Sequence, residues 1–280
     1  MDSSKLRLST PTTTVCYDWI GSSLGLAIGS RRSGKPPGCW NHFDAVLNVT
    51  DTEYEGIHDS IIVDHGDGKS PKNFYLQLPV KEGKRDRYEL ERWMTVGIVF
   101  CIFHLQLKRR VLIHCAQGKD RSVCIALATV VLFCKLTYPL QWKGKRLSDF
   151  PIESILCPKG NSETGETMYR SSGFSVQTVE SLLGNSGREK LFQLVRAHEE
   201  QLCVAGQDHN SDEANLAAGS AENEGRRVSP LADKETIRIA LHLIRQDREV
   251  AEPARSSMQK LNRFFMSEDL PRGVDEKPKR

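Results

Sequence analysis

The sequence predicts an α/β fold with a mostly parallel central sheet flanked by helices. Apolar segments at 43–50, 73–80 and 111–114 have the length and composition of strands. Segment 88–107 repeats apolar residues at helical spacing, and 122–135 is apolar nearly all round, as in a buried helix. Strands that alternate with helices along a chain form parallel sheets, and ligands bind at the carboxyl ends of such strands.

The N-terminal half predicts most of the strands. Segment 22–29 fits a strand or a short helix, and the Gly and Pro residues of 31–38 predict a surface loop. Segment 43–50 predicts a buried strand, and 60–66 is a weaker candidate. Segment 73–80 predicts another strand, which ends at a proline before a charged loop.

The central part predicts two long helices around one short strand. Segment 88–107 carries an apolar face and is followed by cations, which complement the negative end of a helix dipole. The continuous apolar run 111–114 predicts a strand covered on both faces. Segment 122–135 is apolar nearly all round, so we expect a central helix there. The next thirty or so residues show little periodicity and suggest an insertion.

The C-terminal part predicts helices interrupted by a polar loop. Segments 176–183 and 189–201 have helical spacing, and 205–230 lacks the large apolar residues that a packed core needs. Segments 234–248 and 254–266 each carry one apolar face. The predicted organisation is therefore a flexible arm (1–14), a phosphatase-like α/β domain (15–204), a disordered loop (205–232), two helices packed on the same domain (233–268) and a tail (269–280).

Composition and cysteine content limit the class of protein. The 280 residues include 39% apolar and 27% charged residues, with a formal net charge of +3, which by itself does not indicate a nucleic-acid partner. The eight cysteines include none at C-x2-C spacing, so we expect neither a metal site nor a disulfide framework. The chain starts without an apolar leader, and its longest apolar run, 125–136, is shorter than the roughly twenty residues of a membrane span. We therefore expect a cytoplasmic protein without a membrane partner.

The segment HCAQGKDRS at 114–122 predicts a phosphate-binding loop, because C-x5-R stands between a strand and a helix. Backbone N–H groups of such a loop point at one spot, and the helix N-terminus adds positive potential. Gly118 permits the tight backbone path, and Arg121 offers a planar fork for two phosphate oxygens. The predicted phosphate-binding residues are Ala116, Gln117, Gly118, Lys119 and Arg121.

The same segment predicts a nucleophile. A cysteine at a helix N-terminus ionises more readily, so Cys115 is expected to attack a bound phosphate ester as a thiolate. Ser122 is expected to assist the departure of the sulfur from a phosphocysteine. His114 is expected to orient the loop rather than transfer protons. A cysteine that merely packs under a turn would leave the placement of the glycine, arginine and serine unexplained.

The order of FDAVLNVT, NFYLQLPV, the long helix and VLIHCAQGKDRS resembles that of the protein tyrosine and dual-specificity phosphatases. This resemblance implies a general acid in the loop 81–87, where Glu82 and Asp86 are the candidates. Asp120 is a third catalytic candidate, because some lipid-directed relatives use an acid inside the phosphate loop. Glu82 and Asp86 also fit ordinary solvated loop charges, and the choice among the three stays open.

A narrower resemblance rests on YDWIGSSLGLAIGS, GKDRSVCIALATVVLFC and PARSSMQKLNRFFM. These segments are similar to the C-terminal phosphatase-like domain of the initiator tRNA 2'-O-ribosylphosphate transferases. Those enzymes of fungi and plants transfer a phosphoribosyl group from phosphoribosyl pyrophosphate to a T-stem adenosine of initiator tRNA, which keeps that tRNA out of elongation. The resemblance implies initiator tRNA as partner and phosphoribosyl pyrophosphate as co-substrate, with no other cofactor.

Family members carry a substantial region before this domain, so the resemblance implies a truncated chain with little transferase turnover of its own. The segment SETGET is too loose a match to a phosphoribosyl-pyrophosphate loop. The donor site therefore lies either in that preceding region or in the loop from Cys115 to Arg121, and the sequence leaves both open.

A tRNA partner implies cations near the phosphate loop. The loop 81–87 follows a strand and should lie on the same edge as Cys115. The basic clusters at 107–110 and 143–146 should point away from it, and every cluster also fits an ordinary solvated surface. The predicted RNA-binding residues are Lys81, Lys84, Arg85 and Arg87.

Three functions remain open at this point. The first is a phosphatase-like domain that takes part in ribosylphosphate transfer to initiator tRNA. The second is a free-standing cysteine-dependent phosphatase. The third is a non-catalytic module that binds phosphate or RNA.

Overall fold

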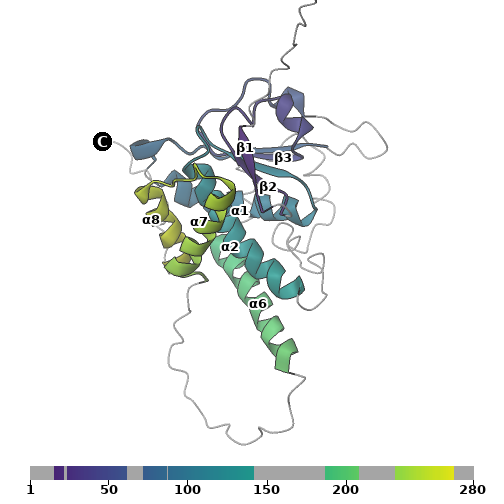
Figure 1. Ribbon diagram of the computed structural model, residues 1–280, viewed down its shortest axis with the longest axis vertical. Helices are drawn as coiled ribbons and strands as arrows, with labels where there is room; N and C mark the ends of the chain where they lie inside the picture. The colour runs from purple at the N-terminus through teal and green to yellow at the C-terminus, as the bar shows by residue number, and fades with distance from the viewer. Residues whose placement is uncertain are drawn as a thin grey trace, which may run out of the picture.

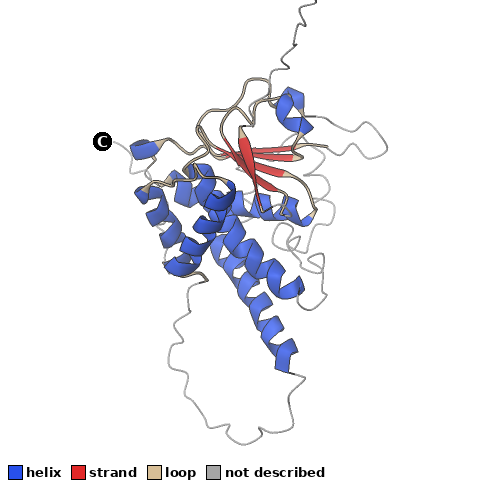
Figure 2. Cartoon of the chain, viewed as in Figure 1, coloured by secondary structure: helices blue, strands red, loops and turns tan. Residues whose placement is uncertain are grey.

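A computed structural model describes residues 16–21, 24–61, 72–86, 88–141, 187–207 and 231–267. For 134–141, 198–207 and Lys84 it describes the backbone alone. Within these ranges the protein is a five-stranded sheet with long helices packed against one face (Figures 1 and 2).

The sheet has the strand order β1-β2-β5-β3-β4. Strands β2, β5, β3 and β4 are parallel, and only β1 pairs antiparallel with its neighbour β2. This confirms the predicted mostly parallel sheet, and it places the carboxyl ends of four strands at one edge. The strands are β1 (Tyr17–Ile20), β2 (Leu26–Gly29), β3 (Ala45–Asn48), β4 (Phe74–Gln77) and β5 (Val111–His114).

The larger hydrophobic core lies between the sheet and the long helices. Alternate strand residues such as Ile28, Leu47 and Ile113 point into it, as the two-residue period of a strand requires. Helix α2 is central: its residues 121–133 are buried on every side, and it contacts the other four helices (Figure 1). The helices are α1 (Glu89–Gln106), α2 (Arg121–Gln141), α6 (Gly187–Gln207), α7 (Lys234–Asp247) and α8 (Arg255–Met266).

The opposite face of the sheet is covered by short elements. The 3-10 helices η1 (Gly38–Asn41) and η2 (His58–Ser60) and their loops bury a second cluster that includes Phe43 and Tyr75. Strand β5 is buried at all four positions, because it is covered on both faces as the apolar run 111–114 predicts.

The observed elements follow the predicted ones closely, with one strand added. Strand β1 was not predicted, because four residues next to a tight turn carry too short a pattern. Segment 22–29, which fitted a strand or a helix, forms β2 at its end. Helix α2 continues six residues beyond the predicted end, and α6 begins and ends outside the predicted segment 189–201. The predicted elements at 60–66 and 176–183 lie wholly or mostly outside the described residues.

The predicted domain organisation is described only in part. The arm 1–14, the tail 269–280 and most of the loop 205–232 lie outside the described residues, as do the basic cluster 143–146 and the segment SETGET. Helix α7 packs on α2, and α8 packs on α1 and α2, within the larger core.

Candidate functional site

The phosphate loop connects β5 to α2 at the carboxyl edge of the parallel strands. Strand β5 ends at His114, and α2 begins at Arg121. Asn48 and Gly29 are the register partners of His114 on the two neighbouring strands, so the loop leaves the middle of the sheet. The first turn of α2 thus adds its dipole to the loop, at the edge where ligands bind in such sheets.

The sulfur of Cys115 is buried and surrounded by hydrogen-bond donors. The Gly118 N–H and the Ser122 hydroxyl each donate to Cys115 Sγ over 3.2 Å. Burial opposes ionisation, but the Ser122 donors, the Arg121 charge and the Asp120 N–H outweigh it and lower the pKa of Cys115. The loop is therefore built to hold a negative charge at this position.

Three carbonyl groups of the loop accept hydrogen bonds from donors that lie outside the loop. Ala116 O accepts from Arg31 N over 3.2 Å, and Lys119 O accepts from Glu252 N over 3.0 Å. Gly118 O accepts from Arg248 Nε over 2.8 Å. In a planar trans peptide the carbonyl and the next N–H point in opposite directions. The N–H groups that follow these carbonyls, at residues 117, 119 and 120, are therefore directed to the inner side of the loop.

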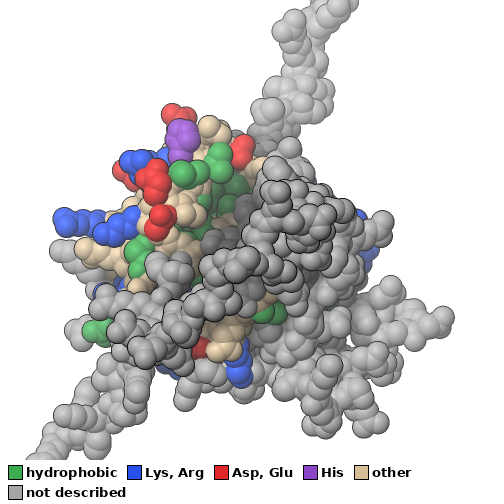
Figure 3. Space-filling view, turned by 90° about the horizontal axis from the view of Figure 1, so that it is seen from below, with side chains coloured by type: hydrophobic (Ala, Val, Ile, Leu, Met, Phe, Trp, Pro, Cys, Tyr) green, Lys and Arg blue, Asp and Glu red, His purple; other side chains and the backbone are tan. Residues whose placement is uncertain are grey.

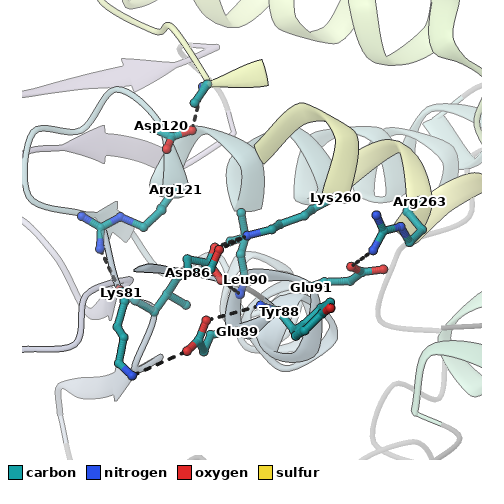
Figure 4. Close-up of polar contacts among 12 residues, drawn as sticks. Lys81, Asp86, Tyr88, Glu89, Leu90, Glu91, Asp120, Arg121, Lys260 and Arg263 are labelled. Atoms are coloured by element: carbon teal, nitrogen blue, oxygen red, sulfur yellow. Dashed lines mark hydrogen bonds and ion pairs between the residues drawn. The ribbon is translucent and has the colours of Figure 1, made fainter. Parts of the chain in front are cut away.

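Arg121 is held beside the loop by the segment that follows β4. Its side chain is 4% exposed, and Nη1 donates to Val80 O over 2.7 Å. Nη2 lies 3.7 Å from Glu82 Oε1. The positive charge of Arg121 contributes to the lowered pKa of Cys115, so the guanidinium and the sulfur are near enough to bind the same anion. Figure 4 shows this side chain reaching from the start of α2 toward the segment after β4.

The three candidate acids have different surroundings. Glu82 is exposed and is the one of the three that forms an ion pair with Arg121. Asp86 is buried and turned toward α8, where its Oδ2 lies 2.6 Å from Lys260 Nζ (Figure 4). Burial, and a hydrogen bond shared with Glu89, raise the pKa of Asp86. Its other oxygen accepts from the Leu90 N–H at the start of α1.

Asp120 also makes a structural contact. Its Oδ1 accepts from Ala254 N over 2.9 Å, at the residue that precedes α8 (Figure 4). Glu82 is therefore the candidate acid whose carboxylate reaches the phosphate-loop arginine from solvent, whereas Asp86 and Asp120 hold other elements in place.

His114 lies buried beneath the loop. Its Nε2 is 3.5 Å from the Tyr54 hydroxyl, and the chain at Gly34 packs directly against its ring. Burial lowers the pKa of His114 to about 3, so the ring is neutral near pH 7. Arg31 completes this wall: its guanidinium lies over the Tyr54 ring and donates to the Thr52 and Glu53 carbonyls.

The predicted RNA-binding segment lies beside the loop, because Arg121 contacts Val80 immediately before it. Lys81 and Arg85 are exposed, and Lys81 pairs with Glu89 over 3.8 Å. Arg87 and the side chain of Lys84 lie outside the described residues. On the face in Figure 3, the described basic side chains lie among acidic ones, so that face presents mixed charge.

Sequence reasoning missed the residues that brace the loop from outside. Arg31, Arg248 and Glu252 are far from Cys115 in the chain, and no local pattern marks them as its neighbours. Arg248 stands at the end of a predicted helix, where a cation is ordinary. Only the packing of α7 against β1 brings it to Gly118.

Among the residues that the structure describes, no helix is long and apolar enough to cross a membrane. No group of three or more His, Cys, Asp or Glu side chains in those ranges is arranged to hold a metal ion. The described cysteines at 16, 39, 101, 115 and 124 are free thiols.

The chain is similar in structure to solved phosphatase domains at low sequence identity. The Yvh1 phosphatase domain from Chaetomium thermophilum is 13% identical, with a TM-score of 0.42, covering 88% of this chain and 93% of that one. Human DUSP28 is 13% identical, with a TM-score of 0.30, covering 68% and 96%. No curated protein matches the chain.

One family matches the region that carries the loop. Residues 74–149, from β4 through α2, match the Rit1 DUSP-like domain of the initiator tRNA PT family. The match includes Cys115, Arg121 and Ser122 together with the candidate acids. This match agrees with the predicted resemblance to the phosphatase-like domain of the initiator tRNA ribosylphosphate transferases.

Proposed function

We propose that the loop from Cys115 to Arg121 binds the phosphate group of a substrate, and that the chain is the phosphatase-like domain of an initiator tRNA 2'-O-ribosylphosphate transferase. The observation that carries the proposal is the convergence of donors on Cys115 Sγ: the Gly118 N–H, the Ser122 hydroxyl and the Arg121 charge. Groups that hold a thiolate also bind a phosphate oxyanion. The family match supports a tRNA-modifying context.

In this proposal the bound phosphate belongs to phosphoribosyl pyrophosphate or to the initiator tRNA itself. The exposed cations Lys81 and Arg85 lie after β4, beside Arg121, where a nucleic-acid backbone would meet them. A free thiol in the loop is kept in a reducing compartment, so the proposal includes a cytoplasmic location.

A second function, that of a cysteine-dependent phosphatase, is favoured by the lowered pKa of Cys115. The thiolate attacks phosphorus in line, an S–P bond forms, and the P–O bond to the leaving group breaks. The leaving oxygen takes a proton from an acid, for which Glu82 is best placed. In the second step water gives a proton to that same carboxylate and attacks phosphorus, the S–P bond breaks and phosphate is released, while the Ser122 hydroxyl donates to the departing thiolate.

The first experiment tests the loop without assuming a reaction. Iodoacetamide labelling of Cys115, followed by mass spectrometry of its peptide, is measured with and without tungstate as a phosphate-like oxyanion. We expect tungstate to protect Cys115 and to leave the labelling of half-buried Cys16 unchanged. Equal labelling of Cys115 at all tungstate concentrations would refute both functions.

The second experiment separates the functions. Purified chain is assayed for release of phosphate from an aryl phosphate and for transfer of labelled ribosyl phosphate from phosphoribosyl pyrophosphate to initiator tRNA. Transfer that requires Arg121 supports the transferase. Phosphate release that is lost in Cys115→Ser and reduced in Glu82→Gln, but not in Asp86→Asn, supports the phosphatase. Oxyanion and tRNA binding without either reaction indicates a non-catalytic module.

A further inference from the structure

The link between α7 and α8, residues 248–254, contacts the phosphate loop at three successive residues. Arg248 Nε donates to Gly118 O over 2.8 Å, and Glu252 N donates to Lys119 O over 3.0 Å. Ala254 N donates to Asp120 Oδ1 over 2.9 Å. This link lies outside residues 74–149, the region that matches the family. The outer side of the loop is thus built by a part of the chain far from it in sequence.

Arg248 is placed to control the direction of one peptide group. Arg248 is 6% exposed, its Nε donates to the Gly118 carbonyl, and its Nη1 donates to Asp18 Oδ2 of β1. One planar guanidinium therefore joins the loop to the edge strand in a fixed geometry. A lysine could not make both contacts with the same angles, because its ammonium is a point donor.

The effect on the binding side follows from peptide geometry. When the Gly118 carbonyl points to Arg248, the Lys119 N–H must point in the opposite direction, to the inner side of the loop. Gly118 stands at φ 71°, in the left-handed region where a backbone peptide can rotate at little cost in glycine. An external anchor is therefore needed at this residue more than at its neighbours.

We propose that Arg248 is a positioning residue of the oxyanion site, which rests on the proposed function of the loop. It holds the Gly118–Lys119 peptide so that the Lys119 N–H faces the bound oxyanion. The Glu252 N–H does the same for the next peptide, so that the Asp120 N–H faces inward. The Asp120 N–H is among the groups that lower the pKa of Cys115, which agrees with this direction.

The test compares Arg248→Met and Arg248→Lys with wild type and with Arg238→Met. Arg238 is the matched control: it is an exposed arginine of α7 that pairs with Glu235 of the same helix and not with the link. Tungstate affinity is measured by protection of Cys115 from iodoacetamide, and the labelling rate is recorded against pH. Urea unfolding of each variant shows whether it is folded.

For R248M we expect tungstate binding weaker by about ten- to hundredfold, which corresponds to one hydrogen bond to a charged group. The labelling profile of Cys115 should move to higher pH, because an inward N–H is lost. R248K should recover part of both effects, and R238M should behave as wild type. A merely structural arginine would lower the unfolding midpoint of R248M and leave the tungstate affinity and the pH profile of the folded protein unchanged, and that result would overturn the proposal.

Two further outcomes are distinguishable. If wild type fails to bind tungstate, the function proposed for the loop is wrong, irrespective of Arg248. If R248M does not fold, Asp18→Ala provides the test, because Asp18 holds the other end of the Arg248 guanidinium and its side chain is 45% exposed. D18A should shift the labelling profile in the same direction by a smaller amount, and an unchanged profile in both D18A and R248K would overturn the proposal.

Discussion

Replacement of Gly118 by alanine should disrupt the phosphate loop. Gly118 has φ 71°, and a Cβ there would lie 2.4 Å from Gly29 O and 2.6 Å from Arg248 Nη2. The Gly29 oxygen belongs to a central parallel strand and cannot retreat without disturbing the pairing of β2 with β5. The loop itself must therefore move.

The magnitude has two parts that a control can separate. An alanine in the left-handed region costs about 1–2 kcal/mol in backbone conformation. Overlap with a packed neighbour adds about 1–3 kcal/mol. Gly83 has φ 61° but no atom within 4 Å of an added Cβ, so Gly83→Ala should show the backbone cost alone. The expected loss in the free energy of unfolding is thus about 1–2 kcal/mol for G83A and about 2–5 kcal/mol for G118A.

Urea unfolding followed by circular dichroism measures both values, provided the two variants share the slope of wild type. Tungstate protection of Cys115 should be lost in G118A, because the N–H groups are displaced together with the loop. Equal destabilisation of G118A and G83A, or full tungstate binding by G118A, would show that the loop is not confined between β2 and Arg248 and would refute this reasoning.

Three other predictions concern groups around the loop. Lys260→Met should lower the free energy of unfolding, measured in urea, by about 3–5 kcal/mol, because it leaves the Asp86 carboxylate buried without its cation. The double variant with Asp86→Asn should recover part of this loss, and a loss below about 1 kcal/mol in Lys260→Met would contradict a buried ion pair. Burial lowers the pKa of His114 to about 3, below the value of about 6.5 of an unfolded histidine, so its contribution to stability is complete above pH 6.5 and declines as the pH falls from there toward 3. His114→Gln should therefore reduce the fall of the unfolding midpoint between pH 6.5 and pH 3, and an unaltered pH dependence would contradict this prediction. Ser122→Ala removes the hydroxyl donor to Cys115, so the pKa of the thiol should rise and the iodoacetamide profile should move to higher pH, whereas identical profiles would show that the hydroxyl does not hold the thiolate.

Much of the fold and part of the site could be predicted from local sequence. Segment 111–114 predicted a strand covered on both faces, because three consecutive apolar residues, with no polar residue between them, suit such a place. The C-x5-R spacing placed Cys115, Arg121 and Ser122 at one helix N-terminus, since a loop of this length has few paths from a strand to a helix. Strand β1 escaped prediction, because a four-residue edge strand has too little pattern of its own.

The candidate acids show the limit of such reasoning. Glu82 and Asp86 stand four residues apart in one charged loop, and spacing could not rank them. Their difference is tertiary: α8 brings Lys260 to Asp86 and buries the pair, while Glu82 is left in solvent beside Arg121. The burial of Asp86 depends on α8, which lies far along the chain, so the sequence near the two acids could not predict it.

The sequence by itself determined which atoms surround Cys115 from within its own loop, because strand, loop and helix are contiguous and their geometry is local. The tertiary structure alone decided which way the peptide groups of that loop point. Those directions depend on donors from Arg31, Arg248 and Glu252, and such contacts form only when the whole core has packed.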